Sequence, residues 1–113
     1  MAIFSNTRMT QGPILYISGQ TPQQDTEIPV AMYAQTTIVL NKIEAILNQH
    51  DLKWSAVAKM TVFITDAADL GGVRDAFTAI LGEEKPAMSL VVVSGLIDPS
   101  YKVEIEAQAE LPR

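Results

Sequence analysis

Residues 102–108, KVEIEAQ, alternate strictly between polar and apolar side chains. Val103, Ile105 and Ala107 fall on one face, and the polar residues Lys102, Glu104, Glu106 and Gln108 fall on the other. A period of two predicts a β-strand with one buried face. The two glutamates allow two interpretations. They belong to a solvated outer surface, which is the commoner case, or one of them faces a cleft and takes part in chemistry.

The stretch before this strand carries a second strand and a turn. Leu90–Val93 is an unbroken apolar run, which is typical of a strand buried on both faces. Ile97–Ser100 then combines a proline with an aspartate that can accept hydrogen bonds from the nearby backbone. We therefore expect two strands joined by a turn.

Two segments show apolar residues at helical spacing. In the first, about Val30 to Gln49, one face carries an apolar series. Its members are Met32, Thr36, Val39, Leu40, Ile43, Ile46 and Leu47. The second helix is predicted at Leu70–Leu81, and Gly82 follows it as a terminator.

Three further strand segments are predicted. Residues 56–65 alternate with a period of two, and Arg8–Gln11 and Ile14–Ile17 flank the turn signal Gly12-Pro13 as a possible hairpin. Ser18-Gly19-Gln20 ends the last of these strands. Glycine at this point marks either a plain strand end or room for a ligand or a neighbouring backbone.

The order strand, strand, helix, strand, helix, strand, strand predicts a single α+β domain over residues 1–113. We expect a mostly antiparallel sheet of six strands or fewer, with both helices on one face. Phe63 interrupts an otherwise polar strand face, and the Leu90–Val93 strand is apolar on both sides. Another copy of the chain is the simplest cover for a second apolar face.

Charge and composition exclude several function classes. The net charge is −5 and the eight lysines and arginines are scattered, which argues against a nucleic-acid surface. The chain has no cysteine and one histidine, His50, which argues against thiol chemistry, a metal site and a Ser-His-Asp triad. We found no apolar run of membrane-spanning length and no signal-peptide pattern, so a cytoplasmic protein without membrane contact is expected.

The C-terminal segment PAMSLVVVSGLIDPSYKVEIEA resembles the signature of the RidA (YjgF) family. The positions that fit this signature are Pro86, Ala87, Ser89, Val91, Ser94, Leu96, Val103, Glu104 and Ile105. ILYISGQTP is likewise similar to the N-terminal strand of the family. The resemblance implies a fold like chorismate mutase of the bacillus type and a homotrimer with small-molecule clefts between subunits. It implies no cofactor.

The resemblance also implies an activity, the hydrolysis of enamines and imines derived from amino acids, with release of ammonia and a keto acid. In the family, the glutamate that matches Glu104 orients or activates the attacking water, and a hydroxyl that matches Ser18 helps to hold it. Gly19, Gln20 and Ser89 match positions beside the substrate. These roles are expectations for this chain.

One position departs from the family. Met88 stands where the signature has an arginine, whose guanidinium clamps the substrate carboxylate. A hydrogen bond to a charged group contributes ~1.5–3 kcal/mol, so the loss should weaken carboxylate binding strongly. Arg8 is a candidate substitute. Three functions stay open: a deaminase with altered specificity, a metabolite-binding protein without turnover, and, with less support from the charge, a ribonuclease or translation inhibitor.

Overall fold

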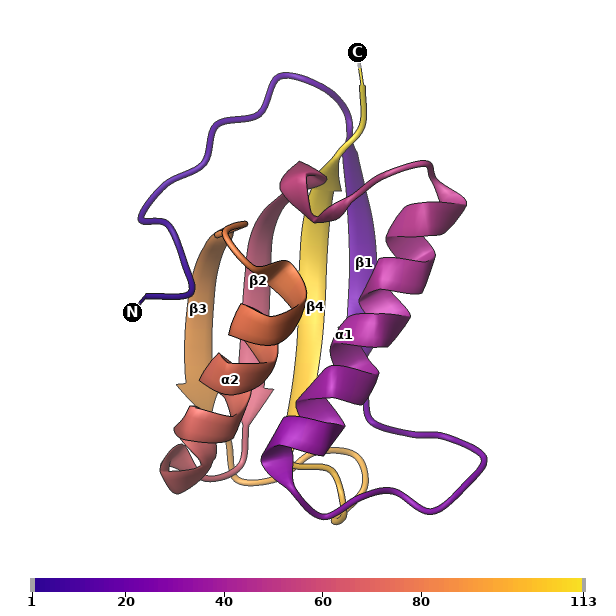
Figure 1. Ribbon diagram of the computed structural model, residues 1–113, viewed down its shortest axis with the longest axis vertical. Coiled ribbons are helices and arrows are strands. Elements are labelled where there is room, and N and C mark those ends of the chain that lie inside the picture. The colour runs from indigo at the N-terminus through magenta and orange to yellow at the C-terminus, as the bar shows by residue number, and fades with distance from the viewer. Residues whose placement is uncertain (1, 113) are drawn as a thin grey trace.

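The computed structural model describes residues 2–112, which form one β-sheet covered by two α-helices (Figure 1). In chain order the elements are β1 (Ile14–Gln20), α1 (Met32–Gln49), β2 (Val57–Ile64), α2 (Leu70–Leu81), β3 (Ala87–Val92) and β4 (Val103–Glu110). Short 3₁₀ turns at Trp54–Ala56 and Ala67–Asp69 precede β2 and α2. The predicted α+β class is confirmed. Neither helix has the length and apolar character that a membrane-spanning segment would need.

The sheet has the strand order β1-β4-β2-β3. β4 pairs antiparallel with β1 and with β2, while β2 and β3 are parallel and are connected through α2. In the register of the three strands, Phe63 on β2 lies opposite Glu104 on β4 and Val91 on β3. The sheet is therefore mostly antiparallel, as predicted, and it brings the two C-terminal strands to either side of β2.

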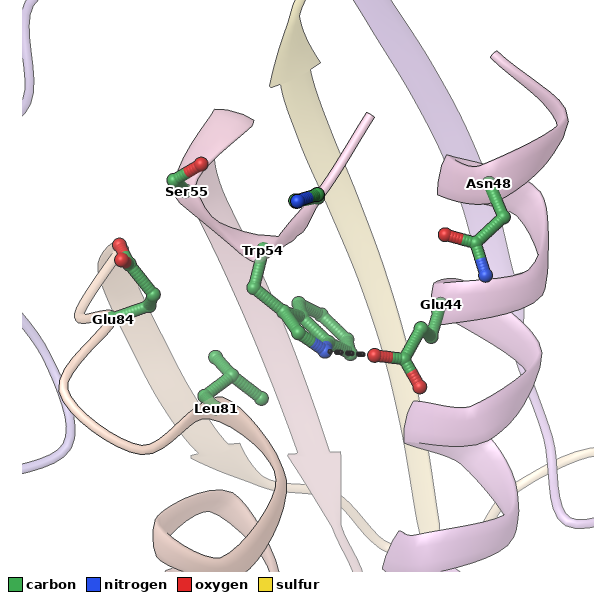
Figure 2. Close-up of a pocket in the computed structure, with 7 residues that line it drawn as sticks. Glu44, Asn48, Trp54, Ser55, Leu81 and Glu84 are labelled. Atoms are coloured by element: carbon green, nitrogen blue, oxygen red, sulfur yellow. Dashed lines mark hydrogen bonds between the residues drawn. The ribbon is translucent and has the colours of Figure 1, made fainter. Parts of the chain in front are cut away.

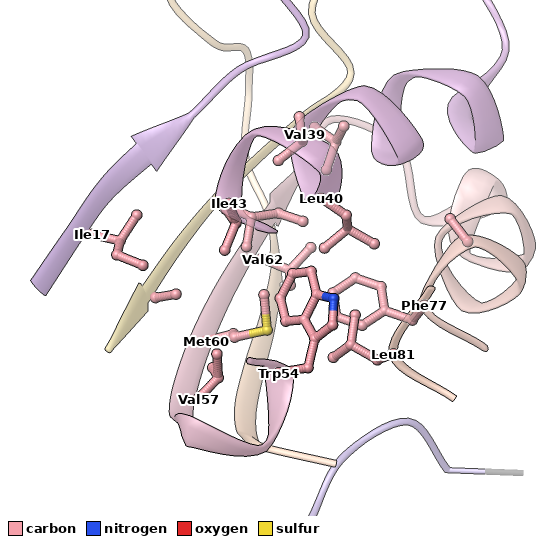
Figure 3. Close-up of a cluster of buried hydrophobic side chains, with 14 of the residues drawn as sticks. Ile17, Val39, Leu40, Ile43, Trp54, Val57, Met60, Val62, Phe77 and Leu81 are labelled. Atoms are coloured by element: carbon pink, nitrogen blue, oxygen red, sulfur yellow. The ribbon is translucent and has the colours of Figure 1, made fainter. Parts of the chain in front are cut away.

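Both helices pack on the same face of the sheet, and the core fills the space between the two layers (Figure 3). The predicted apolar face of α1 is buried there, with Val39, Leu40 and Ile43 fully inaccessible to solvent. The helix begins at Met32, two residues after the predicted start. The bounds predicted for α2 are confirmed, and Gly82 ends it with a positive φ of 61°.

The side chain of Gln35 ties α1 to the segment that enters β4. Its Nε2 donates to the carbonyls of Pro29 and Ser100, both at 2.9 Å, and its Oε1 accepts from the backbone N–H of Lys102 at 2.7 Å. Gln35 is buried, and these three bonds give its amide nitrogen and its amide oxygen partners away from water.

The predicted turn at Ile97–Ser100 forms between β3 and β4. Asp98 Oδ1 accepts from the hydroxyl of Ser100 at 2.6 Å and from its backbone N–H at 2.8 Å. These two hydrogen bonds, the side-chain bond first, hold the pKa of Asp98 below its usual value because they stabilise the carboxylate. The turn thus has the local aspartate bonding that its sequence predicts.

The other face of the sheet, which we call the open face, carries the polar sides of the strands. It comprises Tyr16 on β1, Lys59, Thr61 and Phe63 on β2, Ser89 and Val91 on β3, and Glu104, Glu106 and Gln108 on β4. No element among residues 2–112 packs over it (Figure 1). Phe63 is half-buried on this face. It is the aromatic residue that interrupts the otherwise polar face of the predicted strand.

The predicted hairpin between Arg8–Gln11 and Ile14–Ile17 is wrong. Residues 8–11 form no strand, and β1 pairs with β4 instead. The N-terminal segment crosses to the opposite edge of the sheet, where Ser5 bridges to Ala87 and its backbone N–H donates to Pro86 O at 3.0 Å (Figure 1). The N–H groups of Gln11 and Gly12 donate to the carboxylate of Glu110 on β4, so a long-range partner replaces the local hairpin.

The expectation that Leu90–Val93 is buried on both faces is also wrong for the single chain. β3 lies at the edge of the sheet, and Val91 and Val92 are 39% and 55% exposed. An apolar run does not distinguish a central strand from an edge strand that keeps an apolar surface.

Candidate functional site

Glu104 stands on the open face of β4. It is half-buried, and it lies opposite Phe63 in the register with β2. Glu106, two residues further along the same face, is exposed and lies opposite Thr61. Of the two glutamates singled out by the alternation, Glu104 is therefore the more enclosed.

The enclosure of Glu104 depends on Gly19 of the neighbouring strand. β1 and β4 change register between Ile17 and Gln20, and this irregularity places Gly19 against the Glu104 side chain. A Cβ built on Gly19 would lie 3.0 Å from Glu104 Cδ and closer still to Oε2. The carboxylate thus occupies the volume of the missing side chain, which explains a glycine at this point of the strand.

Ser18 and Gln20 flank this contact. Ser18 is exposed, and its carbonyl accepts a 3.0 Å hydrogen bond from Gln20 Nε2. The structure therefore brings Ser18, Gly19, Gln20 and Glu104 together at one position on adjacent strands. Their predicted roles in catalysis and substrate binding stay predictions.

Ser89 and Met88 lie on opposite faces of β3. Ser89 is on the open face, where its Oγ accepts from Lys59 Nζ at 3.4 Å. Met88 pairs in register with the fully buried Met60 and packs against the core on the helix-covered side. Within one chain, Met88 and Glu104 are consequently separated by the sheet.

Met88 lines a cavity of about 230 Å³ between β3, α2 and the N-terminal segment. We call it the Met88 pocket. Its walls are Ile3, Phe4, Leu70, Arg74, Met88 and Leu90. Nothing in the sequence distinguishes Arg74 from the other scattered lysines and arginines. Its placement depends on the packing of α2 beside β3.

Arg8, the candidate substitute for the missing arginine, points elsewhere. Its guanidinium donates at 3.0 Å to the carbonyl of Ser55, in the 3₁₀ turn before β2. Arg8 is not one of the residues that line the Met88 pocket.

A more polar cavity, of about 410 Å³, lies at the other end of the helix layer (Figure 2). Trp54 is buried there, and its Nε1 donates at 2.9 Å to Glu44 on α1. The carboxylate of Glu44 therefore already accepts a hydrogen bond from the indole of Trp54. Among residues 2–112, no group of three or more His, Asp or Glu side chains is arranged to hold a metal ion.

Known proteins resemble this chain along most of its length. Residues 1–111 match the family model described as Endoribonuclease L-PSP. The 2-iminobutanoate/2-iminopropanoate deaminase of Escherichia coli K12 is 34% identical over 103 residues, which cover 87% of this chain and 80% of that protein.

Solved structures resemble it in fold as well. The crystal structure of Escherichia coli TdcF with bound serine has a TM-score of 0.82 and 30% identity, over 99% of this chain and 91% of TdcF. Rv2704 of Mycobacterium tuberculosis, described as a member of the YjgF/YER057c/UK114 family, has a TM-score of 0.77 and 30% identity. The overlap covers 96% of this chain and 86% of Rv2704.

Proposed function

Because this chain belongs to the endoribonuclease L-PSP family, which includes the RidA (YjgF) proteins that its C-terminal motif resembles, we propose that it hydrolyses imines or enamines derived from amino acids. The products are ammonia and a 2-oxo acid. The deaminase of Escherichia coli, named for 2-iminobutanoate and 2-iminopropanoate, supports this reaction class at 34% identity.

The observation that carries the proposal is the position of Glu104 against Gly19. The Glu104 carboxylate is half-buried on a rigid strand, and Gly19 beside it has no side chain to displace it. In this position the carboxylate can accept a proton from a bound water. In the proposed step, Glu104 takes a proton from water as the water oxygen bonds to the C=N carbon. Glu104 passes this proton to the imine nitrogen, which gives a carbinolamine. The hydroxyl proton of the carbinolamine then moves to the nitrogen by way of Glu104 as the C–N bond breaks, so that ammonia leaves and the carbonyl group of the 2-oxo acid forms. The exposed hydroxyl of Ser18 is available to position the water.

We place this reaction in a cleft between subunits of a homotrimer. The sheet separates Met88 from Glu104 in one chain, so a cleft that contains both positions needs a second copy. Phe63 and Val91 give the open face an apolar centre, which burial against another copy would remove from water. In this arrangement Glu104 of one subunit approaches the Met88 pocket of another.

We further propose that the specificity differs from that of relatives with an arginine at the Met88 position. Met88 offers no positive charge and only a weak acceptor. The smallest substrates, such as 2-aminoacrylate-type imines, have little besides a carboxylate with which to bind. They should therefore be poor substrates.

The test is ammonia release from imines generated in situ by an amino acid oxidase. The wild-type protein should speed the release over the uncatalysed reaction. It should do so more weakly with the imine of alanine than the Escherichia coli deaminase does. Equal rates with that imine would contradict the altered specificity, and no acceleration with any imine would contradict the enzymatic function.

A metabolite-binding protein without turnover is the second candidate function. The serine bound to TdcF supports a site for a small amino acid or a related acid in this fold. Binding that persists when no imine is hydrolysed would favour this function.

A further inference from the structure

We infer that Arg74 on α2 supplies the cationic group that binds the substrate carboxylate, in place of a residue on β3. This inference rests on the proposed function, because it assigns the carboxylate subsite of the same reaction. The ligands that it implies are small 2-imino or 2-oxo acids with an apolar side chain.

The Met88 pocket has the composition that such a ligand needs. Five of its six lining residues are apolar, and Arg74 is its one charged residue. Leu70 and Arg74 are four residues apart, so both lie on the same face of α2 and border the same cavity. The carboxylate would bind at Arg74 and the alkyl chain would contact the apolar walls.

The Arg74 guanidinium has no hydrogen bond or ion pair with any other residue from 2 to 112, and it is exposed at the rim. Its planar fork of donors is therefore available to bind a carboxylate through two parallel hydrogen bonds. Two other cationic side chains already donate hydrogen bonds within the chain. Arg8 donates to Ser55 O, and Lys59 donates to Ser89 on the opposite face of the sheet.

The volume of the pocket limits the size of the ligand that it can hold. Pockets for drug-sized molecules have volumes of about 300–1,000 Å³, whereas the Met88 pocket has about 230 Å³. It therefore suits an acid of a few carbon atoms whose alkyl chain reaches the apolar walls. The smallest imines have almost no alkyl chain, so they gain only the contact with the exposed Arg74 and stay poor substrates. Met88 contributes an adaptable apolar wall to the pocket. With no cationic side chain at position 88, Arg74 is the group in the pocket that can bind the carboxylate.

Calorimetric titration with 2-oxobutanoate and with its uncharged amide tests this assignment without turnover. The wild-type protein should bind the acid about ten- to a hundredfold more tightly than the amide, as expected for charge-assisted hydrogen bonds. Arg74→Gln should lose this preference and Arg74→Lys should keep part of it. Arg8→Gln, the matched control, should bind as the wild type does.

A second variant keeps the test informative. Met88→Arg in the Arg74→Gln background should restore the preference for the acid, since it returns a guanidinium to the same pocket. The inference is overturned if the wild type shows no preference, if Arg74→Gln retains it, or if only Arg8→Gln loses it. Ammonia release, measured in parallel, separates the two proposals. Release that is independent of Arg74 contradicts this inference alone, and Arg74-dependent binding without release contradicts only the hydrolysis.

Discussion

The carboxylate of Glu104 fills the space that a side chain at Gly19 would occupy. A Cβ at Gly19 would lie 3.0 Å from the carboxylate carbon and closer still to Oε2, so the end of the Glu104 side chain would have to move. Two strands that are far apart in the sequence therefore fix one carboxylate on the open face. The glycine has a defined structural purpose, and its replacement has a predictable effect on Glu104.

Gly19→Ala should reduce ammonia release about 10²-fold, because the new methyl group displaces the carboxylate and small misplacements of a catalytic group cost about that much. Stopped-flow or coupled assays of ammonia release would measure the effect.

Gly71→Ala is the matched control for this glycine substitution. Gly71 is exposed on α2, and a Cβ there would meet no atom within 4 Å. This variant should keep full activity and gain about 0.5–1 kcal/mol of stability from helix propensity. If Gly19→Ala is as active as Gly71→Ala, the position of Glu104 does not matter for the reaction.

Gln35→Leu should lower the free energy of unfolding by at least about 2 kcal/mol, because it leaves the N–H of Lys102 and the carbonyls of Pro29 and Ser100 without their partner. Urea unfolding followed by circular dichroism would measure the change. Thr37→Ala, which removes an exposed hydroxyl that donates to Tyr33 O on the same helix, should change stability by about 0.5 kcal/mol or less. Similar values for the two variants would contradict the role of Gln35.

Phe63→Lys should convert the proposed trimer to monomers, because it places a charge at the apolar centre of the open face. Sedimentation velocity would report the oligomeric state. Tyr33→Lys is the matched control. Tyr33 is 47% exposed on α1, in the helix layer, so its replacement should leave the assembly unchanged. A trimer that survives Phe63→Lys would show that another surface holds the subunits together.

Much of the fold could be predicted because its signals are local. The bounds of α2, the alternation of β4 and the turn at Asp98 depend on residues that are near in the sequence. The hairpin at Gly12-Pro13 was predicted from the same kind of signal and was wrong. Its backbone N–H groups are bound by Glu110, ninety-eight residues from Gly12, and a local pattern cannot anticipate that competition.

The site could be predicted only in part. Alternation and the family motif identified Glu104 and Gly19, but their contact depends on a register shift between β1 and β4. Met88 was identified as a departure from the motif. Its position on the helix-covered face, and the presence of Arg74 beside it, follow from strand register and helix packing that no single segment encodes.

The most direct test of the account compares Glu104→Gln with Glu106→Gln in the ammonia-release assay. The two glutamates share one strand face, but only Glu104 is enclosed against Gly19. The account predicts that Glu104→Gln lowers the rate by about 10²–10⁴-fold, as expected for loss of a general base. It predicts that Glu106→Gln stays within about twofold of the wild type, and that both variants keep the oligomeric state of the wild type. Hydrolysis by Glu104→Gln at the wild-type rate would contradict it.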